Sequence, residues 1–177
     1  MLESLPLKGK TAIITGVAGL RSIGLGIAQV LGNAGANLVL SDLQAAGVRK
    51  RAEELRHVGM EAVAVPADVT HRPDVDHLVQ SAVQHYGGLD IVVSNAGLFG
   101  KQSLLEMTES LVQRFLATNI LGNFNVCQAS ARQMVTQKKG GRIVIISSVH
   151  ATLPFLQCSV YGATKRALYT FAQSLAI

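Results

Sequence analysis

Short runs of apolar residues alternate with longer stretches of helical periodicity along this chain of 177 residues. This alternation is typical of repeated strand–helix–strand units, which build a parallel sheet with helices on both faces. The predicted strands are 11–15, 37–41, 61–66, 89–93 and 142–147, and the predicted helices are 23–33, 44–57, 72–86, 110–137 and 161–177. The expected fold class is therefore α/β, with a doubly wound parallel sheet in three layers.

The composition is that of a chain with one sizeable core. Apolar residues make up 49% of the chain and charged residues 15%, which excludes a disordered protein. Aromatic residues make up only 5%, so the core must be built from Val, Ile, Leu and Ala, as in strands buried on both faces. Because 177 residues is the size of one ordinary domain, we expect a single domain over 1–177.

Charge, cysteine content and hydropathy exclude several classes of protein. Cys127 and Cys158 form no Cys-x-x-Cys pair, which argues against a disulfide scaffold or a redox dithiol, and the histidines show no metal-ligand spacing. The net charge of +5 comes from scattered Lys and Arg, so we expect no nucleic-acid partner. No apolar run reaches about 18 residues and 1–10 has no apolar leader, so we expect a cytoplasmic protein without a membrane span.

The connection between the first strand and the first helix is rich in glycine. It reads Thr-Gly-Val-Ala-Gly-Leu-Arg-Ser-Ile-Gly-Leu-Gly-Ile-Ala from residue 15 to residue 28. Glycine lets the backbone approach a pyrophosphate, and the N–H groups of a helix start supply donors to it. The alternative is a turn that only lets helix and strand pack closely. The Lys-Ser/Thr of a mononucleotide loop is missing, so we expect a dinucleotide, held by Gly16, Arg21, Ser22, Ile23 and Gly24.

Asp42, at the end of the second predicted strand, bears on which dinucleotide is bound. A carboxylate at this place accepts hydrogen bonds from the adenosine ribose hydroxyls and repels a 2′-phosphate, so it favours NAD over NADP. Arg21 complicates this prediction, because an arginine in the loop could reach a phosphate instead. The alternative role for Asp42 is to cap the helix that follows.

Tyr161 and Lys165 lie four residues apart, a spacing that places two side chains on one face of a helix. A free phenol has a pKa of about 10, and a neighbouring ammonium favours its ionised form, which suits proton transfer near neutral pH. Ser148 lies 13 residues before Tyr161 and follows the fifth predicted strand, at the sheet edge where ligands bind. Singly each is compatible with an ordinary surface or loop residue, but together they predict a catalytic site.

In this order along the chain, the motifs resemble those of the short-chain dehydrogenase/reductase family, which has a Rossmann-like fold. The resemblance covers the whole chain and rests on the glycine turn at 16–26, Asp42, Asp68-Val69, Asn95-Ala96-Gly97, Asn119, Ser148, Tyr161 and Lys165. It implies that Asp68 and Val69 flank the adenine. It implies that Asn95, Ala96 and Gly97 support the sheet and the cofactor.

The resemblance also implies a catalytic tetrad. Tyr161 would give a proton in ketone reduction and take one in alcohol oxidation, while Lys165 would assist its ionisation and hold the nicotinamide ribose. Ser148 would hydrogen-bond the substrate oxygen, and Asn119 would hold a water that links Lys165 to solvent. The implied activity is the NAD(H)-dependent interconversion of a secondary alcohol and a ketone.

The sequence departs from the family pattern in its loops. The glycine turn is longer than the common form, with Ser22 in place of its middle glycine, and resembles the loop of enoyl-acyl-carrier-protein reductases. Those enzymes place Tyr and Lys further apart, which favours the ketone/alcohol branch of the family for this chain. An enoyl-thioester reductase is kept as the alternative function. Ser94 replaces the first residue of the usual Asn-Asn-Ala-Gly. His150 lies where 3-hydroxybutyrate dehydrogenases carry a substrate-contacting histidine, and its alternative is a plain loop residue.

Family members usually continue beyond the length of this chain, with two further strands and helices that close over the substrate. We therefore expect the fold to stop after the fifth strand and its helix, and a non-catalytic NAD-binding fragment is a further alternative. In the family, the long fourth helix and the last helix pair across subunits. A homodimer or homotetramer is the assembly that the resemblance implies.

Overall fold

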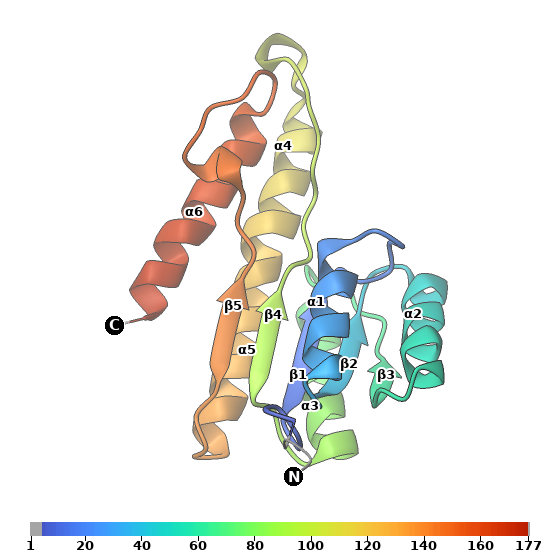
Figure 1. Ribbon diagram of the computed structural model, residues 1–177. Coiled ribbons are helices and arrows are strands. Elements are labelled where there is room, and N and C mark those ends of the chain that lie inside the picture. Colours follow the sequence, from blue (N-terminus) through green and yellow to red (C-terminus); the bar gives the residue numbers. More distant parts are fainter. Residues whose placement is uncertain (1–4, 177) are drawn as a thin grey trace.

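Five parallel strands form one sheet in the order β3-β2-β1-β4-β5 (Figure 1). The computed structural model describes residues 5–176. The strands are β1 (Thr11–Thr15), β2 (Asn37–Ser41), β3 (Ala62–Ala64), β4 (Ile91–Ser94) and β5 (Arg142–Ile145). The chain runs outward from β1 to β3, then returns to place β4 on the other side of β1. This order confirms the doubly wound sheet and puts its switch point between β1 and β4.

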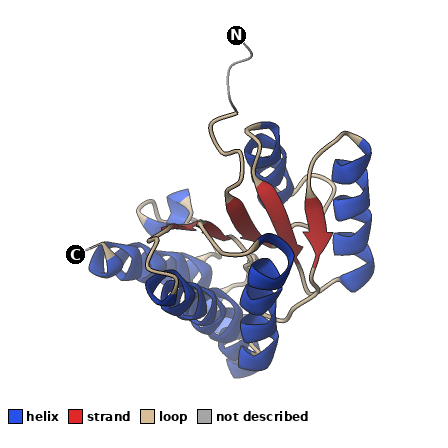
Figure 2. Ribbon diagram, turned by 90° about the horizontal axis from the view of Figure 1, so that it is seen from below, coloured by secondary structure: helices blue, strands red, loops and turns tan. Residues whose placement is uncertain are grey.

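Helices cover both faces of the sheet (Figures 1 and 2). They are α1 (Ile23–Asn33), α2 (Ala45–His57), α3 (Arg72–Tyr86), α4 (Glu109–Phe115), α5 (Asn123–Thr136) and α6 (Ser159–Leu175). A π segment, η2 (Leu116–Gly122), joins α4 to α5 without a break, and the short 3-10 turns η1 (Leu104–Glu106) and η3 (Val149–Ala151) lie in loops. The three predicted layers are therefore present.

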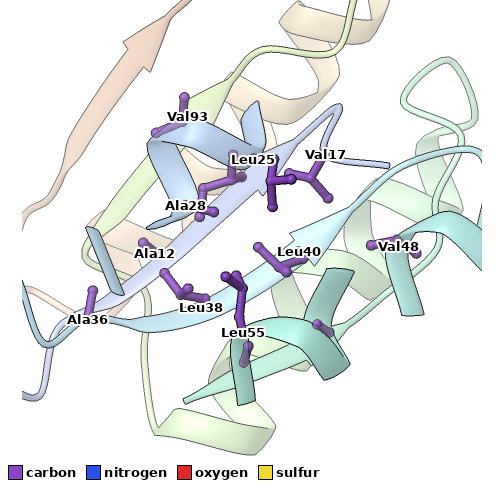
Figure 3. Packing of buried hydrophobic residues seen from close by; sticks show 13 residues of the cluster. Ala12, Val17, Leu25, Ala28, Ala36, Leu38, Leu40, Val48, Leu55 and Val93 are labelled. Carbon is purple, nitrogen blue, oxygen red and sulfur yellow. The ribbon is translucent and has the colours of Figure 1, made fainter. Parts of the chain in front are cut away.

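Alternate side chains of the central strand β1 point to opposite faces of the sheet. Ala12 and Ile14 pack in one buried cluster with Leu25 of α1 and Leu55 of α2 (Figure 3). Ile13 packs into a second cluster with apolar side chains of α3 and α5. The central strands β1, β2 and β4 are thus largely buried on both faces, as the aliphatic composition predicts, whereas the edge strand β5 is partly exposed, with Val144 47% exposed.

Six predicted elements differ in extent from those observed. The strand predicted at 89–93 is Ile91–Ser94, the strand predicted at 142–147 is Arg142–Ile145, and the helix predicted at 44–57 begins at Ala45. The predicted helix 110–137 is composite, because the π segment η2 interrupts its α-helical hydrogen bonding. The predicted strand 61–66 is reduced to Ala62–Ala64, since β3 pairs only with β2 among the described residues. The predicted helix 161–177 begins earlier, at Ser159, and its last residue, Ile177, lies outside the described residues.

The described part of the chain contains no helix that is long and apolar enough to cross a membrane. Within residues 5–176, no group of three metal-ligating side chains occurs. Both cysteines are buried and free, and burial raises the pKa of the Cys127 thiol to about 11. That thiol therefore stays protonated and unreactive at neutral pH.

Candidate active site

A cleft of about 730 Å³ opens at the carboxyl end of the sheet, over the switch point between β1 and β4. The predicted cofactor residues that line it are Gly16, Ser22, Ile23, Asp42, Asp68, Val69, Asn95, Ala96 and Gly97. Arg21, Gly24, Tyr161 and Lys165 are outside its lining. In doubly wound sheets, ligands bind at this place, so the fold brings most of the predicted residues to one binding cleft.

The glycine turn is held against the end of β4 by very close contacts. Gly16 has a φ of +76°, and a Cβ there would lie 2.7 Å from Asn95 Nδ2. A Cβ on Gly24 would lie 2.6 Å from the carbonyl oxygen of Gly16. Asn95 Nδ2 donates to the carbonyls of Thr15 and Gly16 at 2.8 and 3.1 Å. Glycine at both positions therefore allows β1, α1 and β4 to meet beneath the cleft.

The start of α1 presents free hydrogen-bond donors to the cleft. Ser22 is the N-cap, and its Oγ accepts from the Leu25 N–H at 3.2 Å. The N–H groups of Ile23 and Gly24 have no acceptor among the described residues. A helix start with unpaired donors attracts an anion. Arg21 is exposed beside this turn, so the backbone rather than the guanidinium forms the wall of the cleft.

Two carboxylates lie together in the lining of the cleft. Asp42 accepts hydrogen bonds from the backbone N–H of Ala18 at 2.9 Å and of Gln44 at 3.1 Å. The N-cap of α2 is Gln44, so Asp42 ties the glycine turn to β2 and does not cap the helix. Asp68 accepts from the N–H and the hydroxyl of Thr70 at 2.8 and 2.7 Å. A carboxylate accepts about four hydrogen bonds, so each retains capacity for ligand hydroxyls.

Lys165 is fixed at both ends by the residues that follow β5. It is 4% exposed, and its Nζ donates to the carbonyl of Ile146 at 2.9 Å. Ser147 Oγ donates to the backbone carbonyl of Lys165 at 2.8 Å. The ammonium lies 6.0 Å from the centroid of the Tyr161 ring, and burial lowers the pKa of Lys165. The predicted pair is thus together, with the positive charge beside the phenol.

Aromatic rings surround Tyr161. The ring of Phe99 packs edge-on at a centroid distance of 5.0 Å, and those of His150 and Phe115 lie at 6.0 and 6.5 Å. Ser148 lies at the start of η3, where its Oγ accepts from the His150 N–H at 3.2 Å. Among the described residues, no hydrogen bond joins the hydroxyls of Ser148 and Tyr161. The structure therefore brings the predicted substrate residues to one corner beside the cleft.

The Asn119 side chain is fully engaged within the protein. Its Oδ1 accepts from the Leu98 N–H at 2.7 Å, and its Nδ2 donates to the Leu98 carbonyl and to Thr164 Oγ1, both at 3.0 Å. Asn119 is 0% exposed. Its amide therefore bridges the loop after β4 to α6, and both of its N–H groups are used. The water-holding role that the resemblance implies for Asn119 stays a prediction.

Some residues of the cleft were not among the candidates chosen from the sequence. Thr15 Oγ1 accepts from the N–H groups of Asn95 and Ala96 at 3.0 and 2.9 Å, and so closes the joint between β1 and β4. Arg114 and Thr118 also line the cleft. Their spacing of four residues places them on one helix face, and that periodicity is the signal by which the sequence indicates them.

Comparisons with known proteins agree with this geometry. The profile of the family described as short chain dehydrogenase matches residues 10–177. The (S)-acetoin-forming diacetyl reductase of Staphylococcus epidermidis is 36% identical over 94% of this chain and 64% of its own length. The L-rhamnose 1-dehydrogenase (NAD(P)(+)) of Azotobacter vinelandii is 36% identical over 95% of this chain and 66% of its own.

A solved structure extends the likeness to three dimensions. A crystal structure of a short-chain type dehydrogenase/reductase from Mycobacterium marinum matches with a TM-score of 0.93 and 32% identity, over 99% of this chain and 71% of that chain. The chain itself spans 64% of the length of the curated diacetyl reductase that it matches. The matched part includes the cleft and the Tyr161/Lys165 pair, which both lie between residues 10 and 177.

Proposed function

Because the chain belongs to the short-chain dehydrogenase/reductase family, we propose that it interconverts a secondary alcohol and a ketone by hydride transfer. The observation that carries this proposal is the pairing of Tyr161 with a buried lysine ammonium 6.0 Å from its ring. Gly97 connects the pair to the cleft, since a Cβ there would lie 3.4 Å from Lys165 Nζ. A proton-transferring phenol thus stands beside a binding site for a dinucleotide.

We assign the cleft to NAD(H). A bound nicotinamide supplies or accepts the hydride. The unpaired N–H groups of Ile23 and Gly24 support binding of the pyrophosphate. Asp42 supports NAD over NADP, because its carboxylate accepts from ribose hydroxyls and repels a 2′-phosphate. Arg21 lies outside the lining, which further favours the cofactor without that phosphate.

The remaining roles belong to the side chains around the phenol. Tyr161 gives its proton to the ketone oxygen during reduction and takes it back during oxidation. The Lys165 ammonium stabilises negative charge on the phenol oxygen. Ser148 donates a hydrogen bond to the substrate oxygen, where negative charge develops, and His150 contacts the rest of the substrate. Asn119 holds α6 to the loop after β4.

The proposed activity is tested with a panel of 3-hydroxy acids, polyols and steroids, by the absorbance of NADH. We expect at least one class to be oxidised, with kcat/KM for NAD at least about tenfold above that for NADP, from the repulsion between Asp42 and a 2′-phosphate. Reduction of an enoyl thioester without turnover of any alcohol would identify an enoyl reductase. Tight NADH binding without any turnover would identify a non-catalytic binding protein.

We propose further that a second copy of the chain covers the face formed by η2, the start of α5 and α6. An apolar groove of about 430 Å³ there is lined by Leu116, Ala117, Ile120, Leu121, Phe124, Ala167, Leu168 and Phe171. Exposed apolar patches of this kind mark association surfaces. The assembly that we propose is therefore a homodimer, or a homotetramer built from two such dimers.

The substitution Phe124→Glu tests this interface, because Phe124 is 40% exposed within the groove. We expect the mass measured by light scattering to fall by about half or more, since a buried unpaired carboxylate opposes association. Val30→Glu is the control, because Val30 is exposed on α1, away from the groove. A monomeric unsubstituted protein, or an unchanged mass for Phe124→Glu, contradicts the proposal.

We place the protein in the cytoplasm. Cys127 and Cys158 are both free and buried, which suits a reducing compartment. Fractionation of the source cells followed by immunoblotting tests this location, and recovery in a secreted or periplasmic fraction contradicts it.

A further inference from the structure

A line of buried polar side chains runs from β4 to the backbone of Tyr161. The Ser94 hydroxyl donates to Asn123 Oδ1 at 2.7 Å, and Asn123 Nδ2 donates to the backbone carbonyl of Asn119 at 2.8 Å. Asn119 Nδ2 in turn donates to Thr164 Oγ1 at 3.0 Å. The Thr164 hydroxyl donates to the carbonyl of Tyr161 at 2.7 Å. We call Ser94, Asn123, Asn119 and Thr164 the buried polar ladder.

The ladder is shielded from water along its whole length. The exposed fractions of Ser94, Asn123, Asn119 and Thr164 are 1%, 2%, 0% and 1%. A buried polar group that loses its partner costs free energy, because no water replaces the lost hydrogen bond. The ladder therefore favours the arrangement in which β4, the helix around η2 and α6 keep their present positions.

The same two asparagines hold the turn that contains Gly97. Asn119 Oδ1 accepts from the Leu98 N–H at 2.7 Å, and Asn123 Nδ2 reaches the Ala96 carbonyl at 3.4 Å. The lysine of the Tyr–Lys pair has its Nζ 3.4 Å from the position of a Cβ on Gly97. The ladder thus holds both the Gly97 turn, which lies beside the Lys165 ammonium, and α6, which carries Tyr161.

The π segment η2 gives Asn123 its particular place in the ladder. The backbone N–H of Asn123 bonds to the carbonyl of Ile120, while its side chain bonds to the carbonyl of Asn119. A side-chain amide therefore holds the helix backbone at Asn119. Without that amide, the Asn119 backbone loses its attachment to β4 through Ser94. Segments of π-helix frequently occur at functional sites, and this one joins the sheet to the reactive helix.

We propose that Ser94 and Asn123 are positioning residues, which set the placement of Tyr161 and Lys165 relative to the cleft. The proposal rests on the function proposed above. Neither residue lines the cleft, so both act through Asn119 and its contacts. Loss of either one lets α6 and the Gly97 turn at one end of the cleft shift, while the glycine turn, Asp42 and Asp68 at the other end stay in place.

The kinetic test uses Ser94→Ala, which removes one hydrogen bond, and Asn123→Leu, which removes all those of the side chain. We expect kcat to fall about fivefold and about 50-fold respectively, because small misplacements of reacting groups lower rates strongly. The KM for NAD should stay within about twofold, since the glycine turn, Asp42 and Asp68, which make no contact with the ladder, still line the cleft. Ser130→Ala is the matched control: Ser130 is 0% exposed on α5, and its Oγ has no partner among the described residues. Its kcat and KM should not change.

Amide hydrogen exchange tests the ladder without any turnover. The Leu98 N–H bonds to Asn119 Oδ1, so its exchange should be about tenfold faster in Ser94→Ala and Asn123→Leu than in the unsubstituted protein and in Ser130→Ala. If Asn123→Leu fails to fold, Ser94→Ala carries both measurements. Unchanged kcat and exchange in Ser94→Ala overturn the proposal, as does an equal loss of kcat and NAD affinity. If no alcohol is oxidised, the proposed function fails, and Leu98 exchange alone decides the ladder.

Discussion

Replacement of Tyr161 by phenylalanine is expected to lower kcat for alcohol oxidation by about 10³-fold, the scale of a lost proton-transfer group. The substitution removes only the hydroxyl. The ring keeps its contacts with Phe99 and His150, and Thr164 still bonds to the backbone carbonyl at position 161. NADH affinity, measured by fluorescence, and the melting temperature should therefore stay unchanged. The rate should be measured under single-turnover conditions, which separate chemistry from product release.

Tyr169→Phe is the matched control for this substitution. Tyr169 lies on the same helix, α6, and is 44% exposed. Tyr169→Phe removes the same hydroxyl group, but the Tyr169 ring packs against the Arg166 guanidinium at 5.0 Å and does not line the cleft. Its kcat should equal that of the unsubstituted protein. If the Tyr161→Phe variant retains more than about a tenth of the kcat of the unsubstituted protein, another group must transfer the proton.

Gly24→Ala is expected to weaken NADH binding by about 100-fold. The added Cβ would lie 2.6 Å from the Gly16 carbonyl oxygen and 2.8 Å from Asn95 Nδ2, so the glycine turn must move away from β4. Overpacking of this kind typically costs about 1–3 kcal/mol, and here it falls on the donors that face the pyrophosphate. Titration of NADH fluorescence measures the affinity, and a thermal melt measures the stability.

Gly26→Ala, on the same turn of α1, supplies the control. A Cβ on Gly26 meets nothing within 4 Å, so the substitution should stabilise the helix by about 0.5–1 kcal/mol and leave NADH affinity unchanged. Equal binding by the two variants would show that the close approach of Gly24 to Gly16 is not needed for the dinucleotide site.

The elements whose ends carry local signals could be predicted from the sequence. The bounds of β1, α1, β2 and α3 are those predicted from the sequence, and local signals mark the ends of both helices. Ser22 caps α1 with its hydroxyl, and Gly87 ends α3 with a φ of +78°. These signals act within one turn of chain, so they are readable without knowledge of the tertiary structure.

The π segment and the buried polar ladder could not be predicted in the same way. Residues 110–137 have the periodicity of one regular helix, and the interruption at η2 accompanies bonds from Asn119 to Leu98 and Thr164, which are distant in sequence. Ser94 looked like a conservative change in its motif. Its partner Asn123 has no motif at all, since the contact joins residues on two separate elements.

In the candidate site, residues at strand ends and residues in surface loops differ in how well the sequence indicates their position. Residues at the ends of strands, such as Asp42, Asp68 and Gly97, line one cleft, because parallel strands end at one edge of the sheet. Arg21 was expected in the binding site but is exposed beside it. Its side chain follows the local course of a surface loop, which spacing alone does not determine.

The π segment also explains how the continuous helix formed by α4, η2 and α5 packs against two different parts of the protein, the loop after β4 and an apolar cluster. Before η2 ends, Asn119 faces the loop after β4, whereas beyond it Val126 and Ala129 face the cluster that contains Ile13. Deletion of one residue between these regions would rotate everything downstream by about 100°. Either the Asn119 amide would then point away from the loop after β4, or Val126 and Ala129 would point away from the apolar cluster. The additional residue keeps both in phase, so the length of this helix should be as strictly constrained as the identity of Asn119 within it.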